Sequence, residues 1–113
     1  MIWHSIQFPG LPAWVAGEGD PLREVAVAGK ELCLVRRDSG IRAIDARCPH
    51  ARGPLAAGFL NEAQHVVCPW HRFAFDPDTG QSNSGGYFVT CYDVKVDGKS
   101  LLIGIPKKKR WWQ

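Results

Sequence analysis

Two short segments of this chain each combine a cysteine with a histidine. The first is Cys48-Pro49-His50, and the second, after 17 intervening residues, is Cys68-Pro69-Trp70-His71. Thiolates and imidazoles are favoured ligands for zinc, copper and iron–sulfur centres. Two loops that each offer one thiolate and one imidazole can close around a shared metal centre. These residues therefore predict a metal site.

The mixed composition of each segment favours a binuclear iron–sulfur cluster. A [2Fe–2S] rhomb needs two ligands on each iron, and residues two or three positions apart in a tight loop can reach different irons. Cys48 and Cys68 would bind one iron, and His50 and His71 the other. With neutral imidazoles the oxidised centre has no net charge, so it accepts an electron more readily than an all-cysteine cluster. The potential rises to roughly −150 to +300 mV from about −400 mV.

A structural zinc site is the alternative for the same four residues. Zinc also takes two cysteines and two histidines, but residues of the same type are usually paired a few positions apart. Here each segment mixes the two types, and a single residue separates Cys48 from His50. This spacing favours the cluster over zinc.

The composition is that of one compact domain over residues 1–113, with 45% hydrophobic residues. Residues 107–110 contribute four positive charges to the net charge of +3, which leaves −1 for the rest and argues against nucleic-acid binding. Residues 1–10 lack the basic start and apolar run of a signal peptide. No stretch approaches the ~20 apolar residues of a transmembrane helix. We therefore expect a cytoplasmic protein without a membrane span.

Two further cysteines remain once the ligands are assigned. Cys33 and Cys91 lie in apolar, strand-like runs, so we expect buried free thiols. A disulfide between them would need an oxidising compartment, of which the sequence carries no sign.

The elements that must position the ligands are strands. Runs rich in strand formers, separated by Gly-, Asp- and Ser-containing turns, cover residues 22–27, 31–37, 41–46, 87–96 and 99–105. Short extended segments at 58–60 and 65–67 flank a turn at 61–64, and Asp97-Gly98 is expected as a hairpin turn. No helical period stands out, and residues 54–57 could hold one helical turn at most.

The predicted fold is all-β, with an antiparallel base and an inserted cluster-binding subdomain. Residues from about 45 to 82 form this insertion and present the two ligand loops. The insertion has few apolar residues for its length, so we expect its order to depend on bound metal.

On these residues the chain resembles the Rieske-type [2Fe–2S] proteins. The matching residues are both ligand segments, Leu55, Gly58, Leu60, Phe75-Asp76 and Thr79-Gly80. The resemblance implies a Rieske-type fold of stacked antiparallel sheets, a sandwich base, over nearly the whole chain. It also implies one cluster bound by Cys48, His50, Cys68 and His71.

Departures from the respiratory members of that family are informative. Those members join an additional cysteine of each loop in a disulfide, and the corresponding positions here are Gly53 and Trp70. They also direct serine and tyrosine hydroxyls at the cluster sulfurs, where this chain has Phe73 and Phe75. Hydrogen bonds to sulfur raise the potential, so we expect a lower-potential centre. In these features the chain is similar to the soluble Rieske ferredoxins that serve bacterial oxygenases.

The resemblance implies a one-electron carrier rather than an enzyme. Rieske oxygenases add a larger domain with a mononuclear iron, but only His4 and His65 remain after the ligands are assigned. We expect a monomer that takes electrons from a flavin-dependent reductase and delivers them to an oxygenase or reductase. The small Rieske subunit of a nitrite reductase-like enzyme is the alternative function, and a zinc-binding interaction domain is the remote one.

The two histidines are expected at loop tips, where their outer ring edges would form the path by which electrons leave. Trp70 and Pro69 are expected either to shield the cluster or to touch a partner.

Basic residues could serve a partner as well. Arg47, Arg52 and Arg72 could favour the reduced cluster, meet an acidic partner or simply be solvated. The tail at residues 107–113 could dock on an acidic partner or a membrane surface, or be a poorly ordered terminus.

Overall fold

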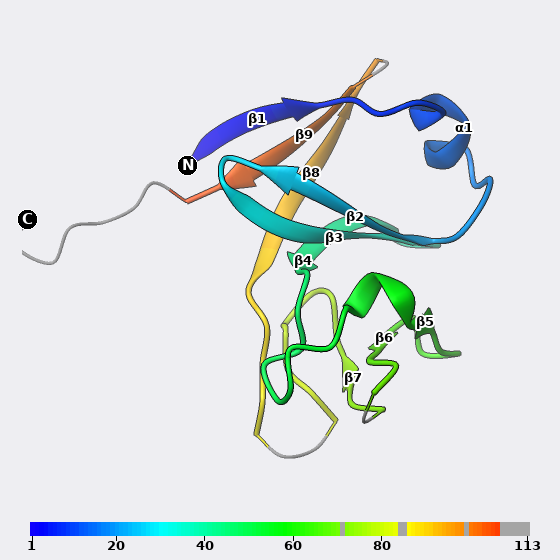
Figure 1. The fold of residues 1–113 in the computed structure, drawn as a ribbon. Helices are drawn as coiled ribbons and strands as arrows, with labels where there is room; N and C mark the ends of the chain where they lie inside the picture. Colours follow the sequence, from blue (N-terminus) through cyan, green and yellow to red (C-terminus); the bar gives the residue numbers. More distant parts are fainter. Residues whose placement is uncertain (71, 84–85, 99, 107–113) are drawn as a thin grey trace, which may run out of the picture.

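Two antiparallel sheets make up the chain in the computed structural model, which describes residues 1–70, 72–83, 86–98 and 100–106 (Figure 1). The larger sheet has six strands in the order β1-β9-β8-β4-β3-β2, and the smaller has three in the order β5-β6-β7. The small sheet lies beyond the end of β4, inside the predicted insertion. The all-β prediction is confirmed, apart from one short helix. The expected tail at residues 107–113 lies outside the described residues.

The strands of the large sheet are β1 Ile2–Ile6, β2 Leu22–Val27, β3 Lys30–Arg37, β4 Gly40–Asp45, β8 Cys91–Asp97 and β9 Ser100–Ile105. The small sheet comprises β5 Phe59–Leu60, β6 Val66–Val67 and β7 Ala74–Phe75. The short 3-10 helix η1, Leu55–Ala57, occupies the segment where one helical turn was predicted. The predicted bounds of β2 are confirmed, whereas β8 begins four residues later than residue 87.

Turn chemistry explains the hairpins of the large sheet. Val27 pairs with Lys30, and the two residues between them, Ala28 and Gly29, have φ angles of 51° and 78°. Positive φ at both positions is the signature of a type I′ turn, whose twist matches that of the strands. In the β8–β9 hairpin Asp97 pairs with Ser100, so Asp97 belongs to β8 and not to the predicted turn.

The helix α1, Leu11–Val15, is a correction to the predicted pattern. It has five residues, about one and a half turns, which is too short to display a helical period. Leu11 and Trp14 lie one turn apart on its buried face. The indole N–H of Trp14 donates to the backbone carbonyl of Asp20 at 2.7 Å and ties down the loop that follows. None of the described helices is long enough to cross a bilayer.

Two apolar cores pack against the large sheet, because successive residues of a strand point to opposite faces. In β3, Leu32 and Leu34 join the core beneath α1, while Cys33 and Val35 join the core shared with the insertion. The members of this second core are Leu22, Cys33, Val35, Ile44, Cys48, Leu55, Val66, Cys68, Phe75 and Val89. The insertion therefore contributes more buried apolar side chains than its composition suggested.

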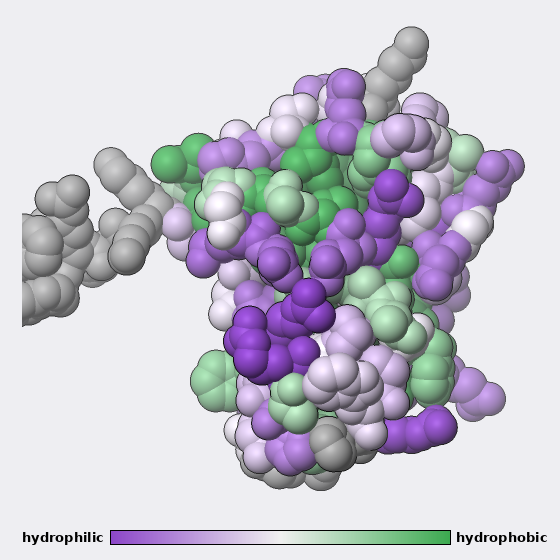
Figure 2. Space-filling view, viewed as in Figure 1, coloured by the Kyte–Doolittle hydropathy of each residue, from purple (hydrophilic) through white to green (hydrophobic). Residues whose placement is uncertain are grey.

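The surface view separates these parts. Strongly hydrophilic side chains gather where the insertion meets the large sheet, whereas hydrophobic side chains are visible over the large sheet itself (Figure 2).

Candidate metal centre

The first ligand segment forms a tight loop directly after β4. The backbone N–H of Cys48 donates to the carbonyl of Gly53 at 2.9 Å, and the N–H of Arg52 donates back to the carbonyl of Cys48 at 2.6 Å. Arg52 has a φ of 59°, in the left-handed region. Pro49 fixes its own φ near −65° and stiffens the turn.

The second ligand segment forms the same kind of loop between β6 and β7. The N–H of Cys68 donates to the carbonyl of Phe73 at 2.8 Å, and the N–H of Arg72 donates to the carbonyl of Cys68 at 3.1 Å. Arg72 has a φ of 61°. The two loops therefore share one hydrogen-bond pattern, and the sequence signal for it is a C-P-x-x-R motif that occurs twice.

The two histidines occupy different positions of the C-P-x-x-R motif in the sequence. His50 is the third residue of its turn and is exposed, as expected of an electron exit. The third residue of the second turn is Trp70, which is 58% exposed and whose side chain lies against Gly53 of the first loop. His71 is the fourth residue by sequence and lies outside the described residues.

Both candidate thiol ligands are completely buried. Cys48 and Cys68 have no exposed surface and lie in the second core. Burial raises the pKa of the Cys48 thiol, the backbone N–H groups of His50 and Ala51 lower it, and the adjacent Cys68 side chain raises it again. Two neighbouring buried thiolates need a positive charge between them, and N–H groups directed at sulfur stabilise the deprotonated form. This donor set fits a metal centre.

The two loops are in close contact opposite the thiols. A methyl group added to Gly53 would lie 2.9 Å from the Cys68 Sγ atom and 3.2 Å from Cδ2 of Trp70. Gly53 and Trp70 thus face each other, as expected of positions that carry a disulfide in respiratory Rieske proteins. Glycine is needed here because any side chain would displace the second loop or its sulfur.

Aromatic rings surround the candidate imidazole ligand. The His50 ring makes edge contacts with Phe73 at a centroid distance of 4.9 Å and with Tyr87 at 5.2 Å. Sequence reasoning missed Tyr87, which was assigned to a long strand. The isolated bridge between Gln81 and Phe88 instead holds this segment as a third loop beside the site.

The two phenylalanines that replace hydroxyl donors lie next to the site. Phe75 is completely buried in the same core as Cys48 and Cys68. Phe73 is half-buried against His50. The ring carbons at both positions offer no hydrogen bond to a sulfur atom.

The remaining candidate residues have other contacts within the chain. Arg47 pairs with Glu31 at 3.3 Å, which accounts for its charge within the chain. Cys33 and Cys91 are free thiols, as predicted, and flank Ile44 across three strands. Burial raises the pKa of Cys33 to about 12, whereas Cys91 is only half-buried.

His65 is the residue before β6, and its Nε2 atom lies 3.8 Å from Oδ2 of Asp76. His4 is on β1, in the large sheet. Neither histidine joins the candidate ligands.

Within the described ranges, no group of three or more His, Cys, Asp or Glu side chains is compact enough for a single metal ion. A binuclear cluster divides its ligands into pairs, and the described residues supply one pair of adjacent thiols with one imidazole beside it.

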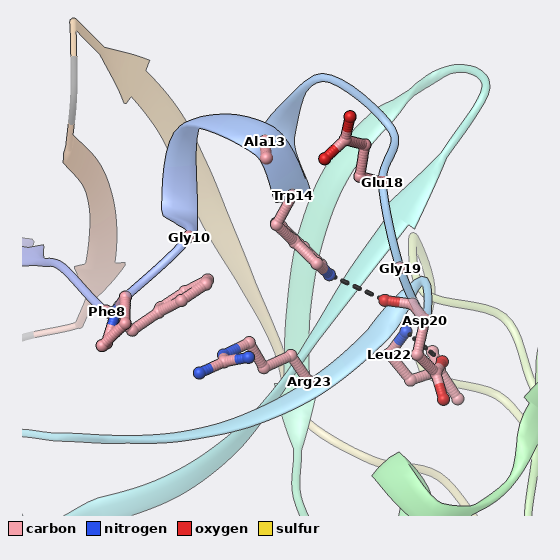
Figure 3. Close-up of a pocket in the computed structure, with 10 residues that line it drawn as sticks. Phe8, Gly10, Ala13, Trp14, Glu18, Gly19, Asp20, Leu22 and Arg23 are labelled. Carbon is pink, nitrogen blue, oxygen red and sulfur yellow. Dashed lines mark hydrogen bonds between the residues drawn. The ribbon is translucent and has the colours of Figure 1, made fainter.

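A separate hollow of about 370 Å³ lies beside α1, lined among others by Phe8, Trp14 and Arg23 (Figure 3). It contains none of the candidate ligands. The guanidinium of Arg23 lies over the Phe8 ring at 3.8 Å. We assign this hollow no part in the metal centre.

Comparison with known proteins places the chain in a family. The Rieske [2Fe-2S] domain family matches residues 13–93. The ferredoxin component of the naphthalene 1,2-dioxygenase system of Pseudomonas aeruginosa is 36% identical over 90 residues, which cover 78% of this chain and 85% of the relative.

Solved structures confirm the Rieske-type fold. The ferredoxin of carbazole 1,9a-dioxygenase from Nocardioides aromaticivorans IC177 has a TM-score of 0.75 at 29% identity, covering 91% of this chain and 98% of that one. A protein assigned as the small subunit of an NADH-dependent nitrite reductase from Mycobacterium tuberculosis has a TM-score of 0.77. At 16% identity, over 95% of this chain and 97% of that one, it shares the fold alone.

The cofactor of this family is a [2Fe–2S] cluster, not zinc. The buried thiol pair, the N–H groups directed at sulfur and the exposed imidazole all suit it. The chain therefore belongs to the Rieske [2Fe–2S] family, as an electron-carrying ferredoxin rather than a catalyst.

Proposed function

We propose that this chain passes single electrons from a flavin-dependent reductase to an oxygenase-type acceptor. Its cluster is held by Cys48, Cys68, His50 and His71, and residues 1–113 form one Rieske domain with a cluster-binding insertion at about 45–82. The observation that carries the proposal is the difference in exposure across the site: both thiols are completely buried, while His50 is exposed.

The buried thiols and the exposed imidazole therefore have different tasks: the thiols hold the cofactor, and the imidazole exchanges electrons with a partner. When bound, the cluster supplies a one-electron couple. The two cysteines act as buried thiolate ligands, and the exposed His50 offers the short route between the centre and a partner. Phe73 and Tyr87 pack against the His50 ring and fix its orientation. Both histidines must be neutral to bind metal, so the metal competes with protons for the imidazole nitrogens.

The choice of partners rests on relatives. The P. aeruginosa relative is the ferredoxin component of a dioxygenase system, which supports an oxygenase as acceptor and a reductase as donor. We propose a monomer, and because encounters between electron carriers are usually small and transient, no large apolar docking patch is required. We also propose a cytoplasmic location for this carrier.

A nitrite reductase subunit is the second candidate, favoured by the fold similarity to a chain of that assignment. A subunit of that kind should co-purify from its native host with a much larger chain. A free ferredoxin should instead be recovered alone and be active when added back.

The test begins with metal analysis and EPR of the dithionite-reduced protein. We expect about two irons per chain and a rhombic signal typical of a Rieske centre. Cys48→Ser and Cys68→Ser should abolish the signal, whereas the matched controls Cys33→Ser and Cys91→Ser should keep it. A colourless, zinc-containing, EPR-silent protein would refute the proposal.

Donor and acceptor are tested by reconstitution. NADH, a flavin-dependent reductase of an oxygenase system and the ferredoxin should together support turnover by the oxygenase component. Turnover that is unchanged when the ferredoxin is left out would rule out this role for the chain.

A further inference from the structure

Two exposed arginines flank the ligands at equivalent positions of the two loops. Arg52 and Arg72 are each the fifth residue of their turn, four positions after the ligand cysteine. Both side chains are exposed, and both residues have left-handed φ angles, 59° and 61°. The two turns therefore give Arg52 and Arg72 the same backbone conformation and leave both cations exposed beside a candidate ligand loop.

These two arginines differ from the others in the described part of the chain. The arginines engaged by the rest of the protein are Arg23 on Phe8, Arg36 on three backbone carbonyls, and Arg37, Arg42 and Arg47 on carboxylates. Among described residues, no carboxylate lies within ion-pair distance of Arg52 or Arg72. Their charges are thus available to a partner.

The backbone does not require arginine at either place. The left-handed region is unfavourable for a residue with a Cβ atom, and glycine occupies it freely. Gln64 has the same conformation, with a φ of 63°, but its side chain is used: it accepts a hydrogen bond from the backbone N–H of Asp38 at 3.2 Å. Arg52 and Arg72 have no such use within the described protein.

The surroundings of the two arginines suit a protein surface. Trp70, 58% exposed, belongs to the second loop and offers an apolar contact beside the charges. Residues 1–106 carry a net charge of −1, because the four basic residues at 107–110 exceed the total of +3. The positive charge at the loops is therefore a local feature and not a property of the whole body.

We propose that Arg52 and Arg72 dock the chain onto an acidic surface around the electron-entry site of its acceptor protein. This inference rests on the proposed electron-carrier function and adds the chemistry of the partner. Complementary charges steer the encounter and fix its orientation more than they add affinity. An acidic acceptor would thus bring its own centre close to the exposed His50.

The experiment measures electron transfer from the reduced holoprotein to two protein probes of opposite charge, acidic cytochrome b5 and basic cytochrome c. In both reactions one electron passes from the ferredoxin to a ferric haem, which becomes ferrous, and no bond is made or broken. The quantity compared is the rate constant with cytochrome b5 divided by the rate constant with cytochrome c. A change in the potential of the ferredoxin itself affects both rate constants and cancels in this ratio.

Removing either charge should lower this ratio at low ionic strength. Arg52→Gln and Arg72→Gln should each lower the rate constant with cytochrome b5 by roughly two- to fivefold, the scale of one exposed ion pair. The rate constant with cytochrome c should rise. Arg52→Lys should restore the ratio, and salt of about 0.15 M should diminish every difference. Lys95→Gln is the matched control, since Lys95 is exposed but lies over Trp3 in the large sheet.

Two results would overturn the inference, and they differ. If iron and the EPR signal are present but the ratio is unchanged in both arginine variants, or falls equally in Lys95→Gln, the docking surface is wrong while the carrier function stands. If the protein holds no reducible cluster, the proposed function fails, and the inference fails with it.

Discussion

The Tyr87 ring packs against the His50 ring edge to face, with centroids 5.2 Å apart and planes at 73°. Phe73 contacts both rings, at 4.9 Å and 5.3 Å. Three loops thereby meet at one imidazole. The exposed candidate ligand is therefore held by aromatic contacts from two other loops, and each ring covers one part of the imidazole.

Tyr87→Ala should therefore shorten the lifetime of the bound cluster. Loss of the ring opens one side of His50, so bleaching of the visible absorbance in air or with a chelator should be several-fold faster. Tyr87→Phe keeps the ring contact and should behave as the wild type. The control is Phe88→Ala, which removes a neighbouring ring that is 69% exposed. Equal bleaching rates in Tyr87→Ala and wild type would show that the ring does not protect the site.

Gly53→Ala should reduce the iron content. The new methyl group would lie 2.9 Å from the Cys68 sulfur, closer than real Cβ atoms come to other heavy atoms. We expect less iron per folded chain, with a fold that circular dichroism still reports as native. Gly40→Ala is the control: its φ of 131° is also unfavourable for alanine, but nothing lies within 4 Å of the added methyl. A full iron complement in Gly53→Ala would contradict the close approach of the two loops.

Phe75→Tyr should raise the reduction potential, provided that the hydroxyl reaches a cluster sulfur. Phe75 is completely buried in the core that holds both thiols, so an added hydroxyl without a partner would be costly. A neutral hydrogen bond contributes about 0.5–1.5 kcal/mol, which corresponds to roughly 20–60 mV for one electron. Redox titration checks this, with Phe73→Tyr on the His50 side as the comparison. No rise would mean that position 75 does not face a sulfur.

The ligand loops and most strands could be predicted because their signals are local. Cys48 and Cys68 each come shortly after a predicted strand, and the spacing to the histidines sets the type of centre. The run Leu22–Val27 is rich in strand formers and ends in a Gly-containing turn, and its predicted bounds agree with the structure. The C-P-x-x-R motif, which occurs twice, is the local sequence signal of the equivalence of the two loops.

The features that could not be predicted from the sequence depend mostly on contacts between segments that are distant in the chain. Tyr87 looks like part of a strand, and only the pairing of Gln81 with Phe88 places it beside His50. Neither local propensity nor periodicity reports such a contact. The helix at Leu11–Val15 begins after Gly10 in a left-handed conformation and carries too few residues for a period. The pairing of Arg47 with Glu31, which separates it from Arg52 and Arg72, follows from packing alone.

Asp78→Asn should lower the melting temperature at neutral pH. Arg37, whose side chain is 8% exposed, donates two hydrogen bonds to Asp78 at 2.9 Å and 3.0 Å and so joins β3 to the loop after β7. These bonds hold the pKa of the Asp78 carboxyl below its usual value. Because Asp78 is 58% exposed, we expect a loss of roughly 0.5–1 kcal/mol.

The pH dependence of this pair has a definite sign. A lowered pKa means that the stabilisation is present above the unfolded pKa of aspartate and is lost as pH falls through the lower pKa of the folded state. The difference in stability between Asp78→Asn and the wild type should therefore shrink in acid. Asp97→Asn, in an exposed hairpin end, is the control and should show little difference at any pH. A difference that grows in acid would contradict the assignment.

Removal of the cluster should loosen the insertion and leave the large sheet intact. The strands β5, β6 and β7 have two residues each, too few for a sheet that is stable by itself. The second core supports them from one side, while metal ligation joins the two loops on the other. Without metal, the two buried thiols lose the charge that holds them together, so the loops should open locally.

Hydrogen exchange followed by mass spectrometry can localise this effect. In the apoprotein the amides of Cys48 and Cys68, which close the two loops through Gly53 and Phe73, should exchange much faster than in the holoprotein. The amides that join β1 to β9 should exchange at the same rate in both forms, because these strands pair with each other in the large sheet and their side chains belong to the core beneath α1. If both regions became unprotected together, the insertion and the sheet would form one cooperative unit. Equal protection of the loops with and without metal would mean that the second core alone is sufficient to order them.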